Sequence, residues 1–219
     1  MPSATNRIVI LISGRGSNME AIVEACKSRT LNGTVVAVIS NRPDARGLST
    51  AKAAGVETAV VDHQSFDSRD SFDQVLADTI DSFQPNVLVL AGFMRILTEA
   101  FVSRFLGKMI NVHPSLLPDY PGLNTHQRAI DNGDREAGAT VHYVTGDLDG
   151  GPAILQGRVT IEQGDDASSL AARILPNEHQ MLVKAIGWHL EGRLSHRPNG
   201  AFLDNEKLPL RGIDWAALT

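Results

Sequence analysis

An asparagine and a histidine two positions apart, Asn111 and His113, form the pair in this sequence whose types best suit polar group-transfer chemistry. They fall at the end of an expected β-strand, where alternate side chains point to the same face. Pro114 and Pro118 follow and stiffen the chain behind the histidine. An amide N–H can donate to a developing oxyanion, and an imidazole can donate to it or move a proton. A histidine with a purely structural role is the alternative interpretation.

A carboxylate lies further along the chain, within Asp147-Leu148-Asp149-Gly150-Gly151-Pro152. This composition predicts a sharp loop before a strand. A plain turn is the alternative, because Asp and Gly dominate turns for local reasons. If Asp149 met His113, its charge would favour the imidazolium form of the ring. The distance between the two residues along the chain leaves that contact a hypothesis.

A glycine-rich turn, Ser13-Gly14-Arg15-Gly16-Ser17-Asn18, separates the first expected strand from the first expected helix. In open α/β sheets, backbone N–H groups and a helix N-terminus meet anions at this point. A dinucleotide fingerprint would need a third glycine where Met19 stands and an acidic residue near Arg42. The turn therefore favours a single phosphate. A tight turn without a ligand and an NADP-binding module that uses Arg42 remain the alternatives.

Strands and helices alternate along most of the chain. Buried-type strands are expected at 7–12, 34–39, 58–61, 87–90 and 109–112, and helices at 17–27, 47–54, 71–83 and 98–105. This alternation predicts an α/β fold with a Rossmann-like, open, twisted, mostly parallel sheet and helices on both faces. Further on, we expect a hairpin-like strand pair at 139–144 and 153–161, a long helix at 168–190 and a loop-like tail with a short hairpin around Asn205. Pro176 should kink or restart the long helix.

The composition narrows the partners and the compartment. The 219 residues carry a net charge of −5, which argues against a nucleic-acid-binding surface. The single cysteine, Cys26, cannot form an internal disulfide, and no signal peptide or membrane span is evident. We therefore expect a cytoplasmic protein with no membrane partner. The sequence does not define the oligomeric state, and a homodimer is one of the arrangements left open.

Four segments occur in an order that is informative as a set: Gly14 to Asn18, Ala91 to Leu97, Asn111 to Pro118 and Leu148 to Pro152. Together they resemble the folate-dependent formyltransferase family, over a stretch from about Arg7 to the end of the chain. The resemblance implies an enzyme of purine biosynthesis that transfers the formyl group of 10-formyltetrahydrofolate to the amine of 5-phosphoribosylglycinamide without a metal. It also implies a single domain over residues 1–219, with a phosphate-binding part up to about residue 105 and a folate and catalytic part from about residue 106.

The resemblance also assigns roles to individual positions. It implies three catalytic residues, Asn111, His113 and Asp149. The expected ribonucleotide contacts are Gly16, Ser17, Asn18 and Glu178. The expected folate contacts are Arg69, Met94, Arg95, Ile96, Leu97, Asn111, Val144, Thr145 and Asp149. Two positions depart from the family pattern, because Leu175 replaces a glutamine and Asn124 replaces a histidine. The first concerns one ribonucleotide contact, and neither concerns the catalytic residues.

Three alternatives stay close to this interpretation. Methionyl-tRNA formyltransferase carries a further C-terminal domain with a basic surface, whereas this chain is acidic and stops at Thr219. Formyltetrahydrofolate deformylase carries a further N-terminal domain, whereas the first strand here starts at Arg7. A regulatory homologue without activity is the third, and the intact set of catalytic residues argues against it.

Overall fold

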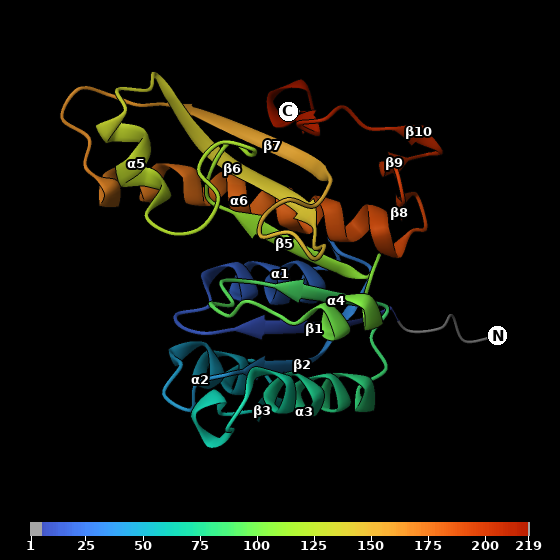
Figure 1. Cartoon of the computed structure of the whole chain (residues 1–219). Coiled ribbons are helices and arrows are strands. Elements are labelled where there is room, and N and C mark those ends of the chain that lie inside the picture. Colours follow the sequence, from blue (N-terminus) through green and yellow to red (C-terminus); the bar gives the residue numbers. More distant parts are fainter. Residues whose placement is uncertain (1–5, 219) are drawn as a thin grey trace.

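The computed structural model describes residues 6–218, and its centre is an eight-stranded sheet. The strands are β1 (Arg7–Ile12), β2 (Thr34–Ser40), β3 (Thr58–Val60), β4 (Val87–Leu90), β5 (Met109–His113), β6 (Glu136–Tyr143), β7 (Ala153–Thr160) and β11 (Ile213–Asp214). Their order is β11-β7-β6-β5-β4-β1-β2-β3 (Figure 1). β1 to β5 are parallel, and β6 is antiparallel to both β5 and β7. The predicted fold class is confirmed.

Helices cover both faces of this sheet. They are α1 (Ser17–Lys27), α2 (Arg46–Ala53), α3 (Arg69–Ser82), α4 (Glu99–Arg104), α5 (Thr125–Asp131) and α6 (Ala167–Leu190), with short 3-10 turns η1 (His63–Ser65) and η2 (Trp215–Ala217). The alternation of side chains along β1 shows how the helices of both faces pack on the same sheet. Ile8 and Ile10 belong to the core that includes residues of α1, α2 and α6, whereas Val9 and Leu11 belong to the core with α3 and α4. A strand buried on both faces in this way reads as a continuous apolar run.

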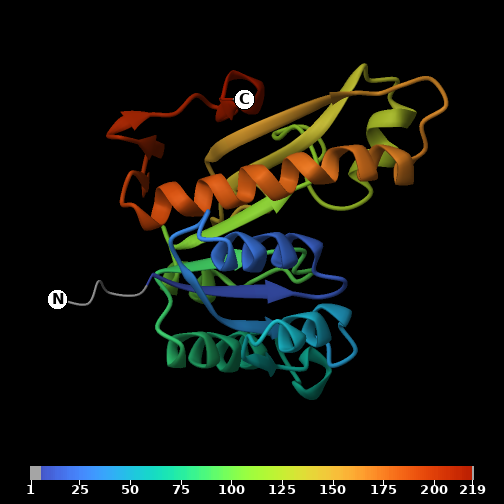
Figure 2. The same cartoon turned by 180° about the vertical axis from the view of Figure 1, so that it is seen from behind.

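The long helix α6 lies beside α1 on one face of the sheet (Figure 2). Asp166 caps it in a capping box with Ser169. Of the kink or restart expected at Pro176, the restart does not occur, because the helix runs unbroken through this residue. Ile174 before the proline and Met181 after it are fully buried, so core packing holds the helix together across the missing N–H group.

The last part of the chain is more regular than a loop-like tail. β8 (Leu194–Arg197), β9 (Gly200–Leu203) and β10 (Glu206–Lys207) form a small antiparallel sheet. The hairpin expected around Asn205 is present between β9 and β10, with Asp204 and Asn205 both in the left-handed region. β11 then pairs with β7 in the main sheet. Neither β11 nor α5 was expected from the sequence. No helix within residues 6–218 is long and apolar enough to cross a membrane.

Candidate active site

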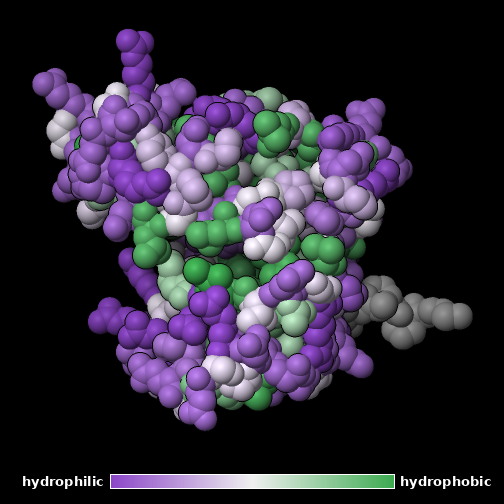
Figure 3. Space-filling model, in the orientation of Figure 1, coloured by the Kyte–Doolittle hydropathy of each residue, from purple (hydrophilic) through white to green (hydrophobic). Residues whose placement is uncertain are grey.

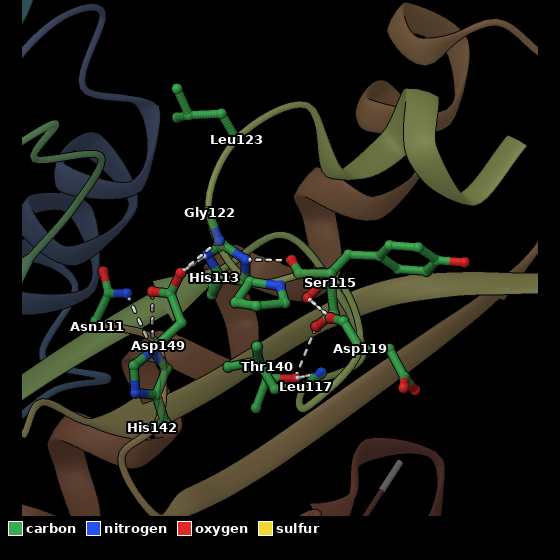
Figure 4. A network of polar contacts seen from close by, with 12 residues as sticks. Asn111, His113, Ser115, Leu117, Asp119, Gly122, Leu123, Thr140, His142 and Asp149 are labelled. Atoms are coloured by element: carbon green, nitrogen blue, oxygen red, sulfur yellow. Dashed lines mark hydrogen bonds and ion pairs between the residues drawn. The ribbon is translucent and has the colours of Figure 1, made fainter. Parts of the chain in front are cut away.

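The carboxyl end of β5 places Asn111 and His113 side by side at the edge of the sheet. β4 pairs with β5 on one side and β6 on the other, so that Asn111 is opposite His142. Asp149 comes from the loop between β6 and β7, and its Oδ2 lies 3.4 Å from Nδ1 of His113 (Figure 4). The two side chains are only 8% and 11% exposed, so solvent screens their attraction weakly. The contact that sequence separation left as a hypothesis is therefore present.

The imidazole of His113 lies between two oxygen acceptors. Its Nε2 is 3.0 Å from the carbonyl oxygen of Tyr120, and its Nδ1 faces the carboxylate of Asp149. A carbonyl oxygen can only accept, so Nε2 carries a hydrogen in this arrangement. Only a doubly protonated ring would donate to both oxygens. The surroundings of His113 thus suit an imidazolium that faces the cavity beside Asp149.

Asp149 is held in place by its own backbone and by a second loop. Its Oδ2 accepts a hydrogen bond of 2.9 Å from the backbone N–H of Gly122. Its φ of 51° lies in the left-handed region, which Asp adopts more readily than most residues. A Cβ at Gly151 would lie 1.8 Å from the carbonyl oxygen of Tyr143. The glycine at 151 is therefore required by the close approach of the loop to the end of β6.

His142 orients the amide of Asn111. It is buried, and this burial lowers the pKa of its imidazole, against the opposing charge of Asp149. Its Nδ1 lies 2.8 Å from the carbonyl oxygen of its neighbour Tyr143, so Nδ1 carries the hydrogen. The unprotonated Nε2 then accepts from Nδ2 of Asn111 at 3.1 Å. One amide hydrogen of Asn111 is fixed by this bond, and the other is free to point into the cavity.

Two adjacent cavities open at this edge and share Gly92, Met94 and Arg95. The first has a volume of about 790 Å³ and is lined by the turn from Ser13 to Asn18 and by residues that follow β2 and β3. The second has a volume of about 620 Å³ and contains Asn111, His113 and Asp149 in its lining. In the space-filling view, hydrophobic side chains gather around a hollow across the middle of this face (Figure 3).

The glycine-rich turn lines the first cavity and contacts α6 through its last residue, Asn18. Gly16 begins α1 with a φ of 82° and without a side-chain cap, so backbone N–H groups of the first turn of α1 are free for an anion. Asn18 donates a hydrogen bond of 2.9 Å to Glu178, 160 residues away along the chain. Burial raises the pKa of Glu178, and the bond from Asn18 acts in the opposite direction. The four predicted ribonucleotide residues are thus neighbours.

The predicted folate residues divide into three groups. Met94, Arg95 and Ile96 line the second cavity together with Asn111, His113 and Asp149. Leu97 and Val144 pack instead against the core beneath α3 and α4. The remaining two, Arg69 and Thr145, lie outside the lining of both cavities. Their contacts with folate remain predictions.

Three observations concern the two positions that depart from the family pattern, the NADP-binding alternative and the expected absence of a metal. Asn124 lies in the lining of the second cavity, whereas Leu175 is half-buried on α6. Arg42 makes a two-point hydrogen bond with Asp44, at 3.1 and 2.9 Å, so a nucleotide phosphate would have to displace this carboxylate. Across residues 6–218, no three His, Cys, Asp or Glu side chains are grouped in a way that could hold a metal ion.

Sequence reasoning missed the backbone partners of the site. The carbonyl of Tyr120 and the N–H of Gly122 fix His113 and Asp149, yet a backbone group has no sequence signature. Nor could the sequence identify His142 as the partner of Asn111. The register that sets it opposite Asn111 depends on how β6 pairs with β5.

A family model described as formyl transferase matches residues 6–186, and the chain belongs to this family. The chain is 50% identical over 205 residues to phosphoribosylglycinamide formyltransferase of Escherichia coli K12. The aligned residues cover 94% of this chain and 97% of that protein. It is 44% identical over 206 residues to the protein of the same name in Haemophilus influenzae. The solved structure of phosphoribosylglycinamide formyltransferase from Coxiella burnetii in complex with CHES superimposes with a TM-score of 0.92 at 46% identity, covering 96% of this chain and 99% of that one.

Proposed function

We propose that this formyl transferase moves the formyl group of 10-formyltetrahydrofolate to the amine of 5-phosphoribosylglycinamide. The products are N-formyl glycinamide ribonucleotide and tetrahydrofolate, a step of purine biosynthesis in the cytoplasm. The observation that carries the proposal is the convergence of Asn111, His113 and Asp149 in the second cavity, which adjoins the first. The family supports the reaction class, and the names of the bacterial relatives support the acceptor.

The first cavity suits the phosphorylated acceptor. The uncapped start of α1 presents N–H groups beside Gly16 and Ser17, and a phosphate is the anion that such a helix start binds best. Asn18 and Glu178 lie next to this position and supply a donor and an acceptor for ribose hydroxyls. The amine at the other end of the ribonucleotide would then reach the second cavity through the residues that both cavities share.

The second cavity suits a flat, mostly apolar donor. Four large hydrophobic side chains in its lining, Met94, Ile96, Leu123 and Leu148, are between 56% and 72% exposed. Apolar side chains left open around one cavity are typical of a ligand site. A pterin ring would cover them, while backbone groups of the loop around Met94 and Ile96 would pair with its polar edge.

The proposed reaction needs no side-chain nucleophile, because the substrate amine attacks the formyl carbon itself. A carbon–nitrogen bond forms, and the formyl oxygen becomes negative. Asn111 donates its free amide hydrogen to this oxygen, and the Nδ1–H of the His113 imidazolium, which faces the cavity beside Asp149, donates to it as well. The bond to N10 of the folate then breaks, and the proton lost by the attacking nitrogen is passed to N10. Asp149 accepts the proton of the attacking nitrogen directly or through water, or it stabilises the charge of His113 while this proton is transferred.

These roles have expected sizes. A single oxyanion donor such as the amide of Asn111 contributes about 3 to 4 kcal/mol to transition-state stabilisation. A positioned proton donor such as His113 contributes a factor of about 100 to 10,000. Most of the rate should therefore depend on these two side chains and on the carboxylate of Asp149 that faces the imidazole.

The test is a spectrophotometric assay with 10-formyldideazafolate and glycinamide ribonucleotide. We expect turnover by the wild type and a loss of about 100- to 10,000-fold in His113→Ala. His196→Ala, in the small sheet outside both cavities, is the control for removal of an imidazole and should keep the activity. Full turnover in His113→Ala would remove His113 from the mechanism.

Two further measurements separate the alternatives. A folate analogue should raise the melting temperature of the wild type, whereas NADP should leave it unchanged, since Arg42 is already paired with Asp44. Hydrolysis of the formyl donor without transfer to the ribonucleotide would instead indicate a deformylase and contradict the proposal.

A further inference from the structure

The segment 91–98 joins β4 to α4 and contains the residues that both cavities share. It has no helix or strand of its own, and its side chains at Met94 and Ile96 are 67% and 56% exposed. Such a segment would lose conformational entropy on binding a ligand unless it were already fixed. Two buried polar side chains from other elements fix it at two points.

The first point is Ser13, the residue that follows β1. Its Oγ accepts a hydrogen bond of 2.8 Å from the backbone N–H of Met94 and donates one of 2.6 Å to Oδ1 of Asn41. Its own N–H donates to the carbonyl oxygen of Gly92 at 3.1 Å. Ser13 is 7% exposed, so these bonds face little competition from water. The same residue also begins the glycine-rich turn of the first cavity.

The second point is Asp73, a buried residue of α3. Its side chain is 2% exposed, and its Oδ2 accepts a hydrogen bond of 2.6 Å from the backbone N–H of Thr98. Its Oδ1 is buried and finds no hydrogen-bond partner within residues 6–218. Thr98 in turn caps α4 through its side chain, so the bond from Asp73 sets where the loop ends.

A buried carboxylate with one free oxygen costs stability, so a role in core packing does not explain Asp73. Both anchored groups are backbone amides, and they enclose the short stretch from Arg95 to Leu97. The side chains of Ser13 and Asp73 do not line the second cavity, so they act on its ligand only through the segment that they hold.

We propose that Ser13 and Asp73 are positioning residues that hold segment 91–98 in its folate-binding conformation before the ligand arrives. Ser13 and Asp73 fix the backbone amides of Met94 and Thr98. The backbone of residues 95–97 then faces the ring of the formyl donor. This inference rests on the proposed function, because it assigns that segment to the folate side of the site.

Asp73 allows a sharp test because Leu and Asn both keep the branching of its side chain at Cγ but divide its polar properties. Asp73→Leu removes the acceptor, whereas Asp73→Asn removes the charge and keeps an oxygen that can accept from Thr98. We expect Asp73→Leu to raise the dissociation constant of a folate analogue by about tenfold, with that of glycinamide ribonucleotide within about twofold of wild type. Asp73→Asn should restore most of the folate affinity. Equal losses in both variants would overturn the assignment of the hydrogen bond.

Ser13→Ala tests the other anchor, and Ser40→Ala is its matched control. Ser40 is also a buried serine near the end of a strand, but within residues 6–218 its hydroxyl bonds to the backbone of Arg42 and not to segment 91–98. We expect Ser13→Ala to raise the KM for the folate donor by about tenfold with a much smaller change in kcat. Ser40→Ala should leave that KM unchanged even if both variants melt at lower temperature.

Amide hydrogen exchange of the free protein supplies a readout that does not depend on folate. The amides of Met94 and Thr98 should exchange faster in Ser13→Ala and Asp73→Leu respectively, while amides of β1 and β4 keep their protection. If the wild type binds no folate analogue, the proposed function fails, and exchange still reports on the anchors. If the wild type binds it, and both variants keep their affinity and their amide protection, the inference is overturned.

Discussion

The two halves of the carboxyl edge are built in different ways. The glycine-rich turn of the first cavity consists of consecutive residues, Ser13 to Asn18, and offers mainly backbone N–H groups at the start of α1. The catalytic cluster joins three segments, at Asn111 and His113, at Gly122 and at Asp149. The residues of the first are adjacent along the chain, whereas the second exists only when the loop between β6 and β7 lies against β5 and its neighbours. Changes in that loop should therefore cost more than changes in the turn.

The largest effect should come from the charge of Asp149. Asp149→Asn keeps an oxygen for the N–H of Gly122, and Asn also tolerates the left-handed backbone. The fold should persist, but the carboxylate that faces His113 is lost. We expect kcat to fall by about 100- to 10,000-fold in the formyl-transfer assay.

The control for this change is Asp147→Asn, the same substitution at an exposed position of the same loop. It should retain nearly full activity and the same melting temperature. Wild-type turnover in Asp149→Asn would falsify the assignment of the carboxylate and leave the loop with a purely structural role.

The second effect concerns the glycines of the two regions. At Gly151 an added Cβ would meet the carbonyl oxygen of Tyr143 at 1.8 Å, whereas at Gly14 it would meet nothing within 4 Å. We expect Gly151→Ala to lower the free energy of unfolding by about 1 to 3 kcal/mol, because the loop must move off β6. Gly14→Ala should stay within about 0.5 kcal/mol of wild type.

Urea unfolding of both variants measures this difference, and the assay adds a second readout. The displaced loop of Gly151→Ala should also carry Asp149 away from His113 and reduce kcat. If Gly14→Ala proved the more damaging change, the view that the turn is the more tolerant region would be wrong.

The same contrast explains how much of the molecule the sequence could predict. The parallel core was predictable because runs such as Arg7–Ile12 have the apolar composition of strands buried on both faces. The catalytic residue types and their same-facing strand position followed from the spacing of Asn111 and His113. The pairing of His113 with Asp149 did not, because it depends on a left-handed residue and on a long-range contact with Gly122. β11 could not be predicted, because a strand of two residues is too short to show an alternation of apolar and polar side chains.

The smallest effect should be a pH dependence on the phosphate side. Burial raises the pKa of Glu178 above its ordinary value. At a pH between the ordinary pKa of a glutamate and the raised pKa of Glu178, the folded chain holds a proton on this side chain that the unfolded chain has released. The free energy of unfolding of the wild type should therefore fall as the pH rises through this window and level off above it. The contribution is at most about 1.4 kcal/mol per pH unit, because a single group exchanges one proton.

Glu178→Gln carries no titrating group at this position, so the difference between its unfolding free energy and that of wild type isolates the effect. Measured by urea unfolding over a pH series, the variant should gain stability relative to wild type as the pH rises through the window. Asn18→Ala removes the hydrogen bond that opposes the shift, so it should extend the falling part of the curve to higher pH. Parallel curves for wild type and Glu178→Gln would show that the carboxyl group titrates alike in both states, and that burial at this cavity does not favour its protonated form.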